Sequence, residues 1–182
     1  MDSINDGLMM KLSEVSGNMK IRIGVIGSDG EISGDVIKIS EKIGRDIAKN
    51  NCLLVCGGKG GVMEAVCRGS KKMGGTVIGI LPSLDKRDAN PYVDIPITTG
   101  MSHARNALVA SCSDIVIVIN GRVGTLSEIG LALSYGKPVI AVKNSGGIAD
   151  TIEEEMKKVG IKERIYSTDV ENAVSLALSL VK

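Results

Sequence analysis

Short, almost wholly apolar segments alternate with stretches of helical periodicity along this chain, and this alternation is the strongest constraint on its fold. β-branched segments without regular polar alternation are typical of a parallel sheet that is covered on both faces. The segments expected to form strands are 21–26, 52–56, 76–81, 93–98, 114–119, 138–142 and 164–167. The segments with helical spacing are 36–47, 62–73, 102–112, 125–135, 149–159 and 170–180. We therefore expect an α/β fold with a doubly wound, mostly parallel sheet of about six to seven strands and helices on both faces.

The length of 182 residues fits one ordinary domain. We expect residues 20–182 to form a single Rossmann-like domain that binds a nucleotide or phosphate. Residues 1–19, which are polar with scattered methionines and no sustained period, are expected to form a flexible or irregular segment. Cys52, Cys56, Cys67 and Cys112 form no C-x-x-C pair and are predicted to be core residues.

The charge balance argues against a nucleic-acid or membrane partner. The chain carries 22 basic and 21 acidic residues, so no general positive field exists to attract either one. The longest apolar runs fall far short of the roughly 20 residues that a bilayer span requires. The first residues also lack the pattern of a signal peptide, and we expect a cytoplasmic location.

Three glycine-rich turns follow predicted strands: 27–30, 57–61 and 121–124. Glycine lets the backbone approach a ligand, and the first turn of the next helix offers unpaired N–H groups to an anion. In doubly wound sheets such turns lie at the ligand site, although glycine also simply permits tight connections. The residues predicted to bind phosphate or ligand are Gly27, Ser28, Gly57, Gly58, Lys59, Gly60, Gly61, Met63, Gly121, Arg122, Gly124 and Thr125.

Two familiar phosphate sites do not match these turns. The first turn reads Gly24-x-x-Gly27-x-x-Gly30 rather than G-x-G-x-x-G, and the second strand is not followed by the acid that a dinucleotide site needs. Lys59 is followed by Gly60 rather than serine or threonine, which excludes the P-loop pattern. An NAD site and a nucleotide triphosphatase loop are therefore not expected.

Three polar residues near the turns each have two interpretations. Glu128 and Thr125 have the T-x-x-E spacing of a helix capping box, which the spacing alone favours over a Glu128 that faces a ligand. Arg105 is either a solvated surface residue or a bidentate anion clamp. His103, the single histidine, is expected to be a cap or surface residue, and because nothing clusters with it we expect no metal site.

Together the turns resemble the Lonely Guy-like (SLOG) superfamily, which is Rossmann-like. The first half of the resemblance is carried by 57–66, Arg68-Gly69 and 74–82, and the second half by 102–106 and 121–128. The chain is most similar to the branch that contains molybdenum-cofactor carrier proteins and proteins labelled "possible lysine decarboxylase". Pyridoxal-dependent decarboxylation is not supported by any motif, and no cofactor is expected.

This resemblance implies two functions, between which the sequence does not decide. The first is hydrolysis of a nucleoside 5′-monophosphate to free base and ribose 5-phosphate, with Arg105 and Glu128 as catalytic residues. Glu128 would hold the ribose hydroxyls and stabilise positive charge at the anomeric carbon, while Arg105 would assist the leaving base or fix the phosphate. The second is a non-catalytic carrier or sensor of a phosphorylated heterocycle such as molybdopterin.

Two residues depart from the family pattern, and they bear on that choice. Arg122 occupies a glycine position, and Asn106 replaces the lysine of an R-K pair. The resemblance also implies a homodimer or homotetramer, with a small phosphorylated ligand as the partner.

Overall fold

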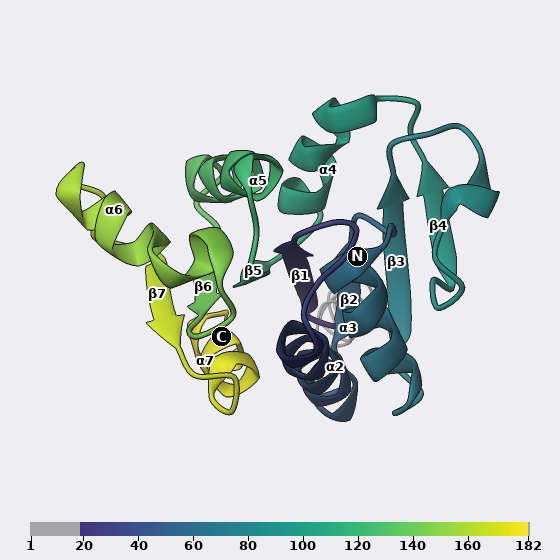
Figure 1. Ribbon diagram of the computed structural model, residues 1–182, viewed down its shortest axis with the longest axis horizontal. Helices are drawn as coiled ribbons and strands as arrows, with labels where there is room; N and C mark the ends of the chain where they lie inside the picture. The colour runs from purple at the N-terminus through teal and green to yellow at the C-terminus, as the bar shows by residue number, and fades with distance from the viewer. Residues whose placement is uncertain (1–18, 182) are drawn as a thin grey trace, which may run out of the picture.

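A seven-stranded sheet, in which every neighbouring pair of strands is parallel, forms the middle layer of the computed structural model, which describes residues 19–181 (Figure 1). Its order is β4-β3-β2-β1-β5-β6-β7. The strands are β1 (Arg22–Gly27), β2 (Leu53–Cys56), β3 (Thr76–Leu81), β4 (Ile95–Thr98), β5 (Ile115–Ile119), β6 (Val139–Val142) and β7 (Ile165–Thr168). The doubly wound α/β fold predicted from the sequence is confirmed. The irregular segment predicted at residues 1–19 lies, except for Met19, outside the described residues.

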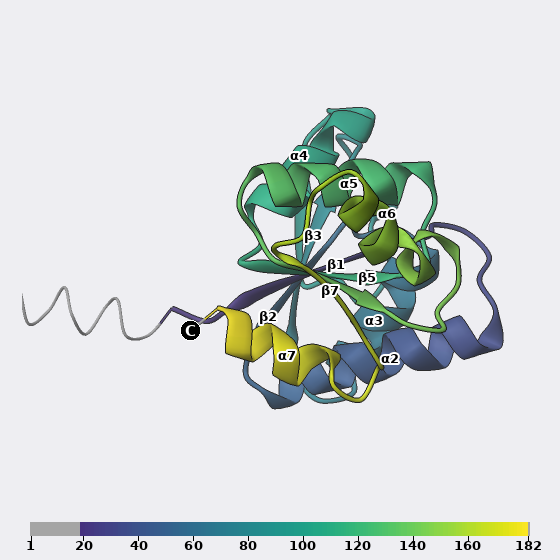
Figure 2. The same cartoon turned by 90° about the vertical axis from the view of Figure 1, so that its left-hand side faces the viewer.

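Helices cover both faces of the sheet (Figure 2). One face carries α2 (Gly34–Lys49), α3 (Gly61–Lys71) and α7 (Ala173–Leu180), and the other carries α4 (Asn106–Ser111), α5 (Val123–Ser134) and α6 (Ile152–Lys158). Short 3₁₀ helices lie at Lys86–Asp88, Ser102–Arg105 and Gly147–Asp150. Two predicted helices therefore begin with a 3₁₀ turn, a common start for an α-helix. Within residues 19–181, none of the helices combines the length and the apolarity needed to cross a membrane.

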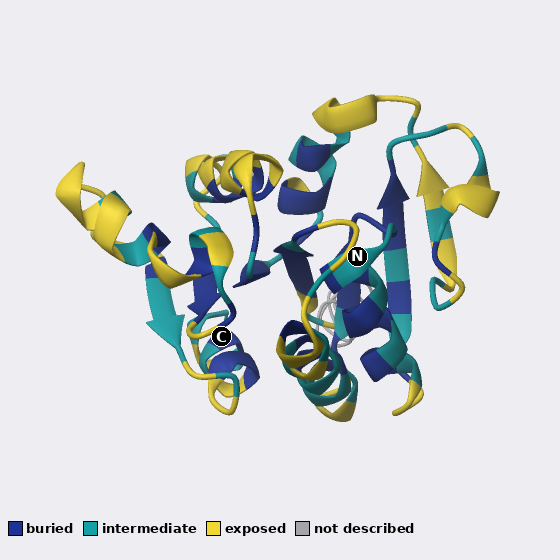
Figure 3. Ribbon diagram, in the orientation of Figure 1, coloured by how far each residue is buried: buried dark blue, intermediate teal, exposed yellow. Residues whose placement is uncertain are grey.

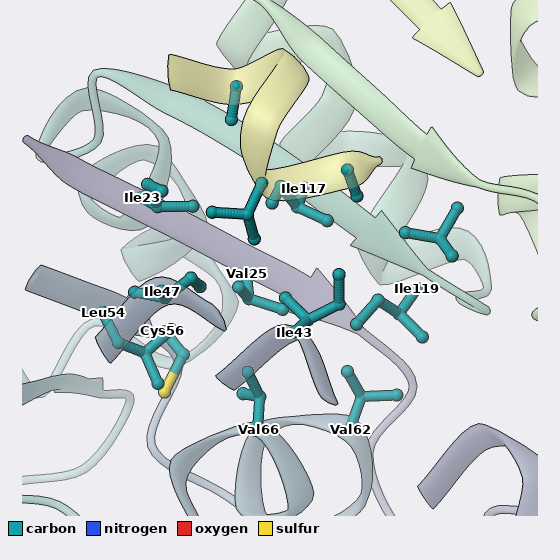
Figure 4. Packing of buried hydrophobic residues seen from close by; sticks show 14 of the residues in the cluster. Ile23, Val25, Ile43, Ile47, Leu54, Cys56, Val62, Val66, Ile117 and Ile119 are labelled. Atoms are coloured by element: carbon teal, nitrogen blue, oxygen red, sulfur yellow. The ribbon is translucent and has the colours of Figure 1, made fainter. Parts of the chain in front are cut away.

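The core consists of two apolar layers, one on each side of the sheet (Figure 3). In β5, Ile117 and Ile119 face the layer beneath α2 and α3, where Figure 4 shows them near Ile43 and Val62. Val116 and Val118, the two valines of β5, face the opposite layer. Burial on both faces explains why the strands show no polar alternation. Of the four cysteines predicted in the core, three are buried and Cys112 is partly exposed.

Two glycines allow α2 and α3 to pack closely. A Cβ at Gly69 would overlap the carbonyl oxygen of Glu41, and a Cβ at Gly44 would overlap the backbone of Val66. Gly69→Ala is therefore expected to lower the free energy of unfolding by about 2 kcal/mol, because backbone atoms cannot move aside as a flexible side chain can. Urea unfolding measures the change. Gly34→Ala is the control, since nothing lies within 4 Å of its Cβ position; equal effects of the two changes would contradict the packing argument.

Candidate functional site

A cavity of about 270 Å³ opens where the strand order reverses, beyond the carboxyl ends of β1 and β5. The volume is near the lower end of the range for small-molecule sites, about 300–1,000 Å³. The cavity is lined by Gly27, Ser28, Asp29, Met63, His103, Arg105, Asn106, Arg122, Gly124, Thr125 and Glu128. Segments far apart in the sequence, after β1, before α4 and at the start of α5, thus meet in one place, as expected for this fold.

The structure brings most, but not all, of the predicted site residues to this cavity. Those that line it are Gly27, Ser28, Met63, Arg105, Arg122, Gly124, Thr125 and Glu128. Those outside its lining are Gly57, Gly58, Lys59, Gly60, Gly61 and Gly121. Asp29, His103 and Asn106 also line the cavity and were not among the predicted site residues. The sequence could have pointed to them, because Asp29 lies in the first glycine-rich turn and His103 and Asn106 lie in the 102–106 motif.

The second glycine-rich turn supports the first turn. Gly61 has φ +59°, and a Cβ there would overlap the carbonyl oxygen of Ser28. The Val62 N–H donates to that same carbonyl at 3.0 Å. Asn90 holds the other side of the turn, because its backbone N–H donates to the carbonyl oxygen of Gly58 at 2.9 Å. Tight backbone packing thus accounts for Gly61, whatever contact it makes with a ligand.

Arg105 and Glu128 form a buried ion pair in the cavity wall. Arg105 Nη1 lies 3.3 Å from Glu128 Oε1, and the two side chains are only 11% and 10% exposed. Gly57 makes room for the guanidinium, since a Cβ there would lie 2.6 Å from Nη1. Arg105 Nε is buried and makes no hydrogen bond within the described part of the chain. Gly57, directly after β2, and Glu128, within α5, therefore position this arginine together.

Burial gives Glu128 an unusual acidity. Loss of hydration raises its pKa from the ordinary 4.5 to about 7, although the charge and hydrogen bond of Arg105 oppose the shift. The carboxyl group is therefore poised between its neutral and ionised forms near pH 7. Such a shift, caused by burial next to a specific charged partner in a cavity, is typical of functional groups.

The capping-box interpretation of Glu128 is wrong. Helix α5 begins at Val123, two residues before the predicted start, and Glu128 pairs with Arg105. The helix starts early because Asn120 and Gly121, with φ +57° and +105°, already turn the chain out of β5. The T-x-x-E spacing therefore lies inside the helix, where it closes no terminus. Since no side chain among residues 19–181 caps this helix start, its first N–H groups remain available to an anion.

The backbone N–H of Gly121 is already engaged inside the protein. It donates to Asn120 Oδ1 at 2.7 Å and to Ser28 Oγ at 3.2 Å. Asn120 is fixed in turn by Ser145, whose backbone carbonyl accepts from Asn120 Nδ2 at 2.8 Å. This network joins the turns after β1, β5 and β6. Gly121 therefore shapes the start of α5, which is a role that spacing alone does not reveal.

Asn106 connects the start of α4 to α5. Its Nδ2 donates to Ser127 Oγ at 3.0 Å and lies 3.4 Å from the carbonyl oxygen of Gly124. Arg122, by contrast, is exposed at the start of α5 and lines the cavity. The two departures from the family pattern thus differ, because Asn106 replaces a charge with an amide that bonds to α5, whereas Arg122 adds a cation to the cavity wall.

Within residues 19–181, no three histidine, cysteine or acidic side chains lie together as a metal site.

Comparison with known proteins places these features in a family. Residues 20–174 match the profile of the SLOG cluster4 family. A molybdenum cofactor binding protein from Rippkaea orientalis has a similar structure, with a TM-score of 0.82 and 34% identity over 91% of this chain and 99% of that one. The molybdenum cofactor carrier protein of Chlamydomonas reinhardtii is also similar, with a TM-score of 0.78 and 29% identity over 90% of this chain and 99% of that one. A cytokinin riboside 5′-monophosphate phosphoribohydrolase from Rhodococcoides fascians is 30% identical over 103 residues, about half of each chain.

Proposed function

The chain belongs to the SLOG cluster4 family, and from this premise we propose that it hydrolyses the N-glycosidic bond of a nucleoside 5′-monophosphate. The products are the free base and ribose 5-phosphate. The observation that carries the proposal is the buried pair of Arg105 and Glu128 in the wall of a cavity that also contains an uncapped helix start. The phosphoribohydrolase relative supports the reaction class. The proposal keeps the cytosolic location expected from the sequence.

The start of α5 binds the phosphate in this proposal. Its first N–H groups and the positive end of its dipole favour an anion, and Arg122 adds a cation beside them. Gly124 has nothing within 4 Å of its Cβ position, so a ligand can approach its backbone. Glu128, one turn further along the helix, then faces the sugar, where its negative charge does not oppose the phosphate.

Glu128 acts on the sugar in its ionised form. It accepts hydrogen bonds from the ribose hydroxyls and stabilises the positive charge that develops at the anomeric carbon as the base departs. Arg105 keeps a fraction of the glutamate ionised despite its burial, because its charge lowers the carboxyl pKa against the effect of desolvation. Its unpartnered Nε is a hydrogen-bond donor beside the same cavity, suited to the leaving base.

A panel of nucleoside monophosphates tests this function. The purified protein is incubated with AMP, GMP, IMP, CMP and UMP, and free base is measured by liquid chromatography. The corresponding nucleosides, which lack the phosphate, are the control and are expected to react much more slowly. No base released above background from any monophosphate would overturn the proposal.

A carrier function is the second candidate, and Arg122 is the observation that favours it. A long cation at the family's glycine position adds a contact to an anionic ligand at the cavity wall, which suits retention more than turnover. Two structural relatives are named for binding or carrying molybdenum cofactor. A carrier requires that a phosphorylated heterocycle raise the melting temperature without being consumed. If such ligands leave the melting temperature unchanged, the carrier proposal fails.

Assembly into a homodimer or homotetramer is part of the proposal, and α4 and α5 supply the surface. The only charged residue within these two helices is Glu128, which is buried, whereas Val123 and Leu126 are 82% and 40% exposed. An uncharged, partly apolar surface is typical of an interface. Because it carries neither sign of charge, it can pack against its own copy about a twofold axis.

Leu126→Glu tests that interface. A charge within this surface is expected to shift the protein to monomer, because association would bury an unpaired carboxylate. Light scattering coupled to size-exclusion chromatography gives the mass. Lys38→Glu, on the exposed face of α2 where Lys38 is 81% exposed, is the control that changes charge elsewhere. An assembly that survives Leu126→Glu would show that copies meet through another surface.

A further inference from the structure

The cavity contains four charged side chains, and only two of them pair with each other. Arg105 and Glu128 form the buried pair, whereas Asp29 and Arg122 make no ion pair with any residue in the described chain. Asp29 lies in the turn after β1, and Arg122 lies in the turn after β5. The two unpaired charges therefore come from turns on either side of the point where the strand order reverses.

Asp29 is held by its own turn and keeps acceptor capacity for a ligand. Its Oδ1 accepts the Gly30 N–H at 2.9 Å, which leaves Oδ2 and one lone pair of Oδ1 uncommitted. Gly60 lies beside it, because a Cβ at Gly60 would be 3.2 Å from Oδ1. The carboxylate thus stands between the first two glycine-rich turns, close to the start of α3.

A ligand that fills this cavity must carry unlike groups at its ends. An anionic group fits Arg122 and the start of α5, as proposed above. The same group is repelled by Asp29, so that side chain meets the other end of the ligand, which must offer hydrogen-bond donors. In a nucleotide with its sugar on Glu128, that end is the base.

We propose that Asp29 is a specificity-determining residue that recognises a heterocycle with a ring N–H adjacent to an exocyclic amino group. Guanine and pterin share this edge, and its two parallel donors match the two oxygens of a carboxylate. Adenine and cytosine offer only the amino group, and hypoxanthine only the ring N–H. This inference rests on the proposed function, because it takes the site of the phosphate from it.

Binding of GMP and IMP tests the inference, because they differ only in the amino group. Dissociation constants are measured by calorimetry in a Glu128→Gln background, so that the base is not released during titration. We expect GMP to bind about tenfold more tightly than IMP, the factor that one hydrogen bond to a charged group supplies. Asp29→Asn is expected to bring the ratio to within about twofold, since one acceptor oxygen becomes a donor.

Two controls separate this inference from the proposed function. Asp35→Asn, at an 86% exposed carboxylate on α2, should keep the preference for GMP. Ribose 5-phosphate should bind equally to the Asp29→Asn protein and its parent, since it lacks a base. An absent preference in the parent, or an unchanged preference in Asp29→Asn, overturns the role of Asp29 alone. If neither nucleotides nor ribose 5-phosphate bind, the proposed function fails and the inference fails with it.

The same binding measurement distinguishes a guanine nucleotide from a phosphorylated pterin as the ligand. 6-Hydroxymethylpterin phosphate carries the edge without ribose. Tighter binding of this pterin than of GMP, with the same loss in Asp29→Asn, assigns the site to a phosphorylated pterin. Tighter binding of GMP assigns it to a guanine nucleotide.

Discussion

Replacing Glu128 with glutamine is expected to lower kcat/KM for base release from a nucleoside monophosphate by about 10³-fold. Glutamine has nearly the same shape and can still bond to a ribose hydroxyl, but it brings no negative charge to the anomeric carbon. The loss should therefore appear mainly in kcat, because the missing interaction is strongest in the transition state. Initial rates measured by base release over a range of substrate concentrations separate kcat from KM.

The structure supplies matched controls for this change. Glu154→Gln removes an exposed carboxylate of α6 that is not part of the cavity lining, and should leave the rate unchanged. Binding of ribose 5-phosphate to the Glu128→Gln protein should persist, which would show that the cavity remains folded. Retention of full activity by Glu128→Gln would remove the glutamate from the reaction.

The fold was predictable from sequence because strands that are buried on both faces of a sheet are apolar along their whole length. A strand such as β5 must be apolar at every position, and the helix starts are marked by glycine turns. The cavity's place was predictable for the same reason, since parallel strands bring their carboxyl ends to one edge of the sheet. The exact helix starts were harder to predict. Helix α5 begins at Val123 because Asn120 adopts a positive φ, which the spacing of residues in the sequence does not indicate.

The partners of individual side chains could not be predicted from sequence. Arg105 and Glu128 are 23 positions apart, and the guanidinium fits only because Gly57, in the turn after β2, has no side chain. The T-x-x-E spacing pointed to a local cap because spacing records neighbours along the helix and not neighbours across the cavity. The same limit applies to Gly121, whose N–H is taken by Asn120 and Ser28, the latter 93 positions away.

The rate of base release is expected to depend on pH through Glu128. Burial raises its pKa to about 7, above the ordinary 4.5, so the ionised form that the reaction requires is scarce in acid. Well below pH 7, kcat/KM should fall about tenfold for each pH unit, and the fall between pH 7 and 5 should be roughly fiftyfold. The phosphate of the substrate titrates near pH 6 and adds its own effect. Binding of the same nucleotide to Glu128→Gln across this range measures that contribution separately.

Stability without ligand provides an independent test of the same pKa. Because the folded-state pKa of Glu128 is raised, the folded protein holds this proton between pH 4.5 and about 7, where the unfolded chain has lost it. The stability associated with the neutral carboxyl is complete below pH 4.5 and is lost as pH rises toward 7. Relative to Glu128→Gln, which stays neutral, the wild-type free energy of unfolding should fall by about 3 kcal/mol across this window. Urea unfolding of both proteins at pH 4.5 and 8 measures the difference, and a constant difference would mean that Glu128 titrates at its ordinary pKa.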